Sequence, residues 1–128
     1  MKPAQVENTI PVLPVSDVTR SIEFYTRTLG FRLDWGGEAS SRICSVSRDG
    51  CCLMLAEGFG ASAPQWVWIG LESEEVFREW KEAGVKVLQE PANWSWAYEM
   101  KFEDPDGNVL WTGTEPRSNE PRRDQTPD

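Results

Sequence analysis

Seven tryptophans and the lack of any histidine define the chemistry available to this chain of 128 residues. Histidine is the commonest metal ligand and the usual proton carrier near neutral pH, so both roles would fall to other side chains. Indole rings stack against flat molecules and attract cations over their faces. A chain this short rarely needs seven tryptophans for its core, and their number therefore favours a recognition surface.

Most of the tryptophans lie in the second half of the chain. In an extended stretch from Trp66 to Leu71, alternation places Trp66 and Trp68 on one face and aliphatic residues on the other, beneath a helix. The same alternation places Met54 and Trp111 on the inner face of their own strands. We expect this lining to suit a flat aromatic or positively charged molecule. A face filled by its own indoles, as a second core, is the alternative.

Glu99 could add a carboxylate to the same face, because Tyr98 and Met100 point the other way. It could face a cation of the ligand, or serve as a lone general base if burial raised its pKa. An exposed strand glutamate is the commoner role for such a residue.

The cysteines offer little for catalysis. Cys44, Cys51 and Cys52 form an odd set without metal-ligand spacing, which predicts reduced thiols that pack in the structure. No histidine and no basic cluster would activate them. We find no glycine-rich phosphate loop, no paired-carboxylate signature and no basic patch.

The elements that position these residues occur in two similar series. The first predicts a strand over 9–15, whose Pro11 and Pro14 fit a sheet edge, and then a helix capped by Ser16 or Asp17 and ended by Gly30. Three extended stretches follow, at 31–35, 42–47 and 51–56, the last two joined by a tight turn.

The second half repeats this order, with a strand at 66–71, a helix at 73–83 and strands near 85–89, 98–102 and 109–112. A period of about 50 residues in two copies indicates one pseudo-two-fold domain rather than a solenoid. We therefore expect an α+β domain over 1–114, built from two βαβββ modules at about 9–56 and 65–114. Residues 115–128 contain no large apolar side chain and predict a polar tail or surface arm.

A net charge of −8 opposes nucleic acid and anionic membranes as partners, because phosphate binding depends on clustered Lys and Arg. Acidic surfaces also simply keep proteins soluble. No apolar run approaches the roughly 20 residues that span a bilayer, and the polar start differs from a secretion signal. We expect a cytoplasmic protein.

Three segments carry a family resemblance: PVLPVSDVTRSIEFYTRTLGF at 11–31, QWVWIGLESEEVFREWKEAGV at 65–85, and WAYEMKFEDPDGNVLW at 96–111. Together they resemble the glyoxalase/bleomycin-resistance/dioxygenase (vicinal-oxygen-chelate) superfamily, and within it most of all the bleomycin-resistance proteins. The resemblance covers residues 10–113 and implies a cup-shaped mixed sheet. The DPDGN segment at 104–108 serves the fold, as a turn whose glycine permits positive φ.

Metal-using members of this superfamily take His or Glu ligands from four strands. Carried over by position, these sites become Ile10, Met54, Trp66 and Trp111. None of these side chains suits a hard or borderline cation. The resemblance therefore implies a relative without metal or other cofactor.

Trp94 and Trp96 lie in a loop of small and polar residues. Trp96 matches the loop tryptophan that bleomycin-resistance proteins stack on flat heteroaromatic rings. Their partner ring on the third strand is replaced here by Ile43, which argues against bleomycin itself, and Trp35 could supply a second ring instead.

These features predict a metal-free protein that binds and sequesters a flat apolar or cationic small molecule, with antibiotic resistance as a special case. The resemblance also implies a homodimer, because such relatives build ligand clefts between modules of two chains. The alternatives are a metal-independent enzyme, related to the lyases or dioxygenases, and a structural module whose cup is closed.

Overall fold

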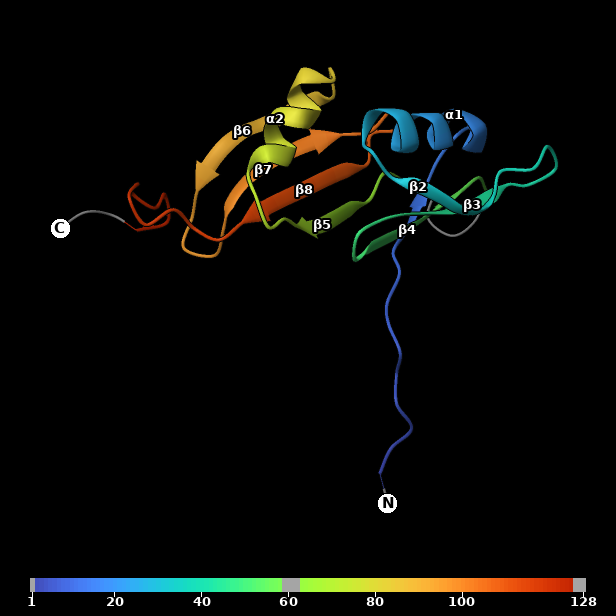
Figure 1. Cartoon of the computed structure of the whole chain (residues 1–128), viewed down its shortest axis with the longest axis horizontal. Coiled ribbons are helices and arrows are strands. Elements are labelled where there is room, and N and C mark those ends of the chain that lie inside the picture. Colours follow the sequence, from blue (N-terminus) through green and yellow to red (C-terminus); the bar gives the residue numbers. More distant parts are fainter. Residues whose placement is uncertain (1, 59–62, 126–128) are drawn as a thin grey trace.

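The computed structural model describes residues 2–58 and 63–125 and consists of two successive βαβββ modules (Figure 1). The first module contains β1 (Val12–Pro14), α1 (Val18–Glu23), the π-helical turn η1 (Phe24–Thr28), β2 (Arg32–Gly36), β3 (Ile43–Arg48) and β4 (Cys51–Ala56). The second contains β5 (Trp66–Gly70), α2 (Glu75–Glu82), β6 (Lys86–Asn93), β7 (Tyr98–Glu103) and β8 (Val109–Thr114). The predicted α+β class and its internal duplication are confirmed.

Each module forms its own four-stranded sheet, in the order β1-β4-β3-β2 and β5-β8-β7-β6. In both sheets the first strand pairs in parallel with the last, and the remaining pairs are antiparallel. The proline-bearing strand β1 is an edge strand, as expected. It is shorter than predicted because Pro11 has no N–H, and only its carbonyl pairs, accepting from Met54 N at 3.0 Å.

Helix α1 begins at the predicted cap, where Asp17 Oδ1 accepts a hydrogen bond from Arg20 N at 3.1 Å. Its continuation widens into η1, in which Leu29 N donates to the carbonyl of Phe24 at 3.1 Å. Gly30 ends the turn with φ of +78°, a conformation that favours glycine.

Both helices lie on the same side of the sheets, and the N-terminal segment extends away on the other side (Figure 1). Beneath the helices, the core includes Tyr25, Leu55, Trp80, Phe102 and Leu110, all at most 1% exposed. No helix among the described residues is long and apolar enough to cross a bilayer.

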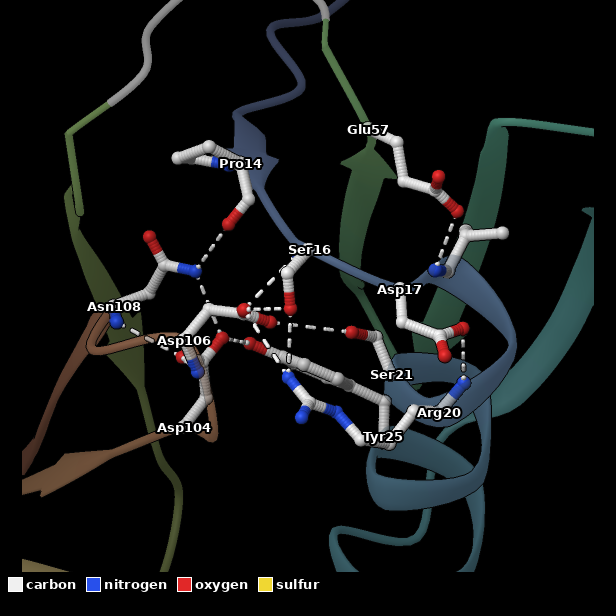
Figure 2. A network of polar contacts seen from close by, with 11 residues as sticks. Pro14, Ser16, Asp17, Arg20, Ser21, Tyr25, Glu57, Asp104, Asp106 and Asn108 are labelled. Carbon is white, nitrogen blue, oxygen red and sulfur yellow. Dashed lines mark hydrogen bonds and ion pairs between the residues drawn. The ribbon is translucent and has the colours of Figure 1, made fainter.

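The turn between β7 and β8 joins the two modules through the buried carboxylate of Asp104 (Figure 2). Asp104 Oδ2 accepts from Tyr25 Oη of the first module and from Asn108 Nδ2, at 2.8 and 2.9 Å. Its Oδ1 accepts from the backbone N–H groups of Asp106 and Asn108, at 2.9 and 2.8 Å. All four acceptor positions of one carboxylate are thereby used.

The neighbouring residues of the turn reach the strand-to-helix connection of the first module. Asn108 Nδ2 donates to the Pro14 carbonyl at 2.9 Å. Asp106 accepts from the backbone and hydroxyl of Ser16, at 3.0 and 2.8 Å, and pairs with Arg20 at 3.2 Å (Figure 2). The turn therefore fixes the start of α1 in addition to its own two strands.

The substitution Tyr25→Phe tests how much this junction contributes to the stability of the fold. Burial first, and then the Asp104 charge, raise the pKa of Tyr25 well above its usual value, so the hydroxyl remains a donor throughout the neutral range. Its loss should lower the free energy of unfolding by about 1.5–3 kcal/mol, as measured by urea denaturation. Tyr98→Phe is the matched control, because no hydrogen bond of its hydroxyl occurs within the described residues. Equal effects of the two changes would refute a special role for Tyr25.

Candidate functional site

Strands β5 and β8 place three indoles on the sheet face opposite α2. Along β5, Val67 and Ile69 are 9% and 6% exposed beneath the helix, whereas Trp66 and Trp68 are 62% and 46% exposed. Trp111 of β8 lies directly beside Trp68 in register. Its ring meets Trp66 edge-on at a centroid distance of 6.3 Å and Trp68 at 5.0 Å. We call this side of the second sheet the tryptophan face.

Gly113 makes room for one of these rings. A Cβ at this position would collide with the six-membered ring of Trp68 and approach the Ala97 methyl group at 3.2 Å. The indole of Trp68 therefore lies across β8 at a residue without a side chain, and a small residue here determines its orientation.

Glu99 of β7 is the acidic group of the tryptophan face and is only 2% exposed. Its Oε2 accepts a hydrogen bond from Trp111 Nε1 and another, at 3.3 Å, from Trp96 Nε1. Burying a carboxylate without such hydrogen-bond donors would be costly. The tryptophans thus supply both exposed ring surface and the donors that hold the glutamate.

Lys101, two residues further along β7, was not singled out from the sequence. Its Nζ lies 5.5 and 5.8 Å from the ring centroids of Trp66 and Trp111 and 4.0 Å from Glu99 Oε1. It also donates to Gln89 Oε1 at 3.0 Å. A strand lysine normally indicates an exposed charge; only the register of β7 against β8 shows that this one faces Trp111.

Trp94 and Trp96 stack on each other in the loop between β6 and β7, with centroids 5.0 Å apart and planes 13° apart. The C-terminal segment holds this loop, because the carboxylate of Asp124 accepts from the backbone and hydroxyl of Ser95. Asn93, 2% exposed, fixes the same segment through the backbone of residues 117, 120 and 121. Residues 115–125 are thus a surface arm that supports the tryptophan loop.

The remaining candidate residues, Trp35, Ile43 and Met54, lie in the first sheet. Trp35 and Met54 are both register partners of Ser45, which places them on one face. Within the described part of the chain, no ring contact or side-chain hydrogen bond joins them to the tryptophans of the second sheet. The candidates therefore form two sets, one for each module.

A groove of about 800 Å³ runs between the modules and has Trp68, Phe31, Trp80 and Cys52 among its lining residues. It does not include Glu99, Trp96 or Trp111. We place the candidate site on the tryptophan face because exposed rings and convergent polar groups occur together there. Trp68 belongs to both surfaces.

The thiols are poorly suited to nucleophilic attack. Burial raises the pKa of Cys44 to about 11 and also raises the pKa of Cys51. Both groups are therefore protonated near neutral pH, whereas the thiolate is the reactive form.

Comparisons with known proteins agree with this architecture. The model of the Glyoxalase/Bleomycin resistance protein/Dioxygenase superfamily matches residues 6–112. The solved structure of TnmS3, an antibiotic binding protein from Streptomyces sp. CB03234, is 25% identical with a TM-score of 0.76, covering 90% of this chain and 100% of that one. A glyoxalase/bleomycin resistance protein from the same organism is 27% identical with a TM-score of 0.71, covering 84% and 99%.

TioX from Micromonospora sp. ML1 is 18% identical with a TM-score of 0.75, covering 85% of this chain and 99% of that one, and shows the shared fold. A comparison with curated proteins gave no match.

The four positions that the family resemblance assigns to metal ligands carry side chains that do not fit a metal. Ile10, Trp66 and Trp111 offer no lone pair suited to a cation, and the thioether of Met54 is a single soft donor. Across residues 2–58 and 63–125, no group of three or more His, Cys, Asp or Glu side chains could hold an ion.

We predict that the purified protein contains no stoichiometric divalent metal, because these four side chains cannot replace imidazole or carboxylate ligands. Elemental analysis after chelation and dialysis, with the dialysis buffer as control, measures this directly. A content of about one zinc, iron or manganese per chain that survives chelation would overturn the prediction.

Proposed function

Because the chain belongs to the glyoxalase/bleomycin resistance protein/dioxygenase superfamily, we propose that it binds and sequesters a flat small molecule on its tryptophan face without a metal. One observation carries the proposal: Trp66, Trp68 and Trp96 are 62%, 46% and 55% exposed around a buried glutamate. Side chains that fill their own core would be covered. Exposed rings beside fixed polar groups are typical of ligand sites.

The likeness to an antibiotic binding protein supports a binding role and makes antibiotic resistance a special case of it. We infer that the protein acts in the cytoplasm, where its cysteines would remain reduced.

A metal-independent enzyme is the second candidate, with Glu99 as general base. Its burial favours this role, but Glu99 Oε2 is already occupied by two indole N–H donors, and Lys101 faces Oε1. Both acceptor positions of Oε2 are therefore used, which leaves only Oε1 to approach a substrate proton. Turnover of a bound compound by the metal-free protein, abolished in Glu99→Gln, would favour the enzyme.

Trp96→Ala tests the binding proposal. Removing this ring should cost about 1 kcal/mol or more of binding free energy toward whichever naphthalene or quinoline derivatives bind the unmodified protein. Calorimetric titration measures the affinity, and quenching of tryptophan fluorescence reports the contact.

Leu33→Ala, which shortens a 42% exposed side chain of the first sheet, should leave the affinity unchanged. Trp96→Ala should lower the free energy of unfolding less than Leu53→Ala, whose side chain is 1% exposed. Unchanged affinity together with a large loss of stability would identify Trp96 as core filler and reject the proposal.

We further propose that two copies of the chain together form the cleft. The N-terminal segment runs away from the sheets (Figure 1), and Val6 is 84% exposed. Among the described residues, no ring contact or hydrogen bond joins Trp35 to Trp111. A partner could cover both.

Sedimentation should therefore show a dimer at about ten micromolar chain, and removal of residues 2–10 should weaken it. The matched comparison is a chain in which the same segment is replaced by Gly and Ser. A monomer for the full chain at this concentration would reject the shared cleft while leaving binding by a single chain open to the Trp96 test.

A further inference from the structure

Lys101 occupies the place on the tryptophan face that a cationic ligand would take. Its ammonium lies within 6 Å of two ring centroids, at 5.5 Å from Trp66 and 5.8 Å from Trp111, which is the range of cation–π attraction. The side chain is 22% exposed, so the group is partly covered and held in position. A cationic ligand would have to displace this lysine or bind against its charge.

The acidic group nearby is not free to receive a cation either. Glu99 Oε2 accepts from the indoles of Trp96 and Trp111, and Oε1 faces Lys101 at 4.0 Å. The negative charge is therefore balanced from within the chain. This arrangement does not support the sequence-based expectation that Glu99 faces a cation of the ligand.

Hydrogen-bond donors exceed acceptors around this pair. The ammonium has three N–H groups, of which one is directed to Gln89 Oε1 at 3.0 Å. The buried amide nitrogen of Gln89, whose oxygen accepts from Lys101, has no acceptor among the described residues. The N–H groups of the partly exposed Lys101 that are not directed to Gln89 could donate to acceptor oxygens of a bound molecule.

Resting on the proposed binding function, we propose that Lys101 determines ligand specificity and selects flat aromatic anions. A carboxylate or phenolate oxygen of the ligand would accept from Lys101 Nζ, while its ring lies against the neighbouring indoles. The hydrogen bond would be charge-assisted and formed at a partly covered site, which strengthens it. The net charge of −8 disfavours anions at long range, so the selection would act only on contact.

Three probes of similar shape and different charge test this selection: 2-naphthoate, 2-naphthamide and N-methylquinolinium. Calorimetric titration of the unmodified protein should rank their affinities in that order, with 2-naphthoate about tenfold or more tighter than the cation. This ranking of affinities is measured on the unmodified protein alone.

Lys101→Met should weaken 2-naphthoate about tenfold and strengthen N-methylquinolinium, because the aromatic rings become free for a cation. Lys101→Arg should retain the preference for the anion, and Lys101→Gln gives a second neutral variant if the methionine variant does not fold. Lys86→Met removes an exposed lysine of the same sheet, paired with Glu103, and should leave all three affinities unchanged.

Two negative results would lead to different conclusions. Equal affinities for the three probes, or tighter binding of the cation by the unmodified protein, overturn the selection by Lys101 and leave the binding function standing. Failure of all three probes to bind counts against the binding function itself, and the inference about Lys101 falls with it.

Discussion

The hydrogen bond from Tyr25 of the first module to the carboxylate of Asp104, whose other three bonds lie within the second module, is the constraint on which the arrangement of the modules depends. The two sheets share no strand pairing in the described chain, so backbone hydrogen bonds within sheets do not determine how they lie together. A buried charge with every acceptor position filled permits only one arrangement of its donors. Tyr25 comes from the first module and the other donors from the second, and the junction is therefore directional in a way that apolar packing alone is not.

The tryptophan face combines stability and the proposed recognition in the same side chains. Trp111 and Trp96 hold a carboxylate through their N–H groups, and their rings belong to the face on which we propose that a ligand binds. The rings are thus pre-oriented before anything binds, which lowers the entropy lost on association. Because each of these tryptophans supplies both a ring and an N–H donor, few substitutions are tolerated there. Phenylalanine would keep a ring but remove the donor to Glu99.

The sequence predicted what depends on local periodicity and missed what depends on register between strands. The alternation around Trp66 and the glycine after the first helix follow from single segments, and both occur as expected. The position of Lys101 beside the indoles depends on its pairing with Trp111 and Gln89. These residues lie on the two neighbouring strands and meet Lys101 only in the folded sheet. The turn η1 has no marker in its residues, since π-helical and α-helical hydrogen bonds are both made by backbone groups that every residue of this segment carries.

The contact between the C-terminal segment and the tryptophan loop affects how this protein should be attached to a sensor chip. Asp124 holds the Ser95 backbone, so a load applied at the C-terminal end would pull on the segment that carries Trp94 and Trp96. The opposite end is equally unsuitable if it contributes to pairing of chains. The exposed residue Arg78, on the solvent side of α2, offers an anchoring point that leaves both ends of the chain untouched and the indoles directed toward the sample.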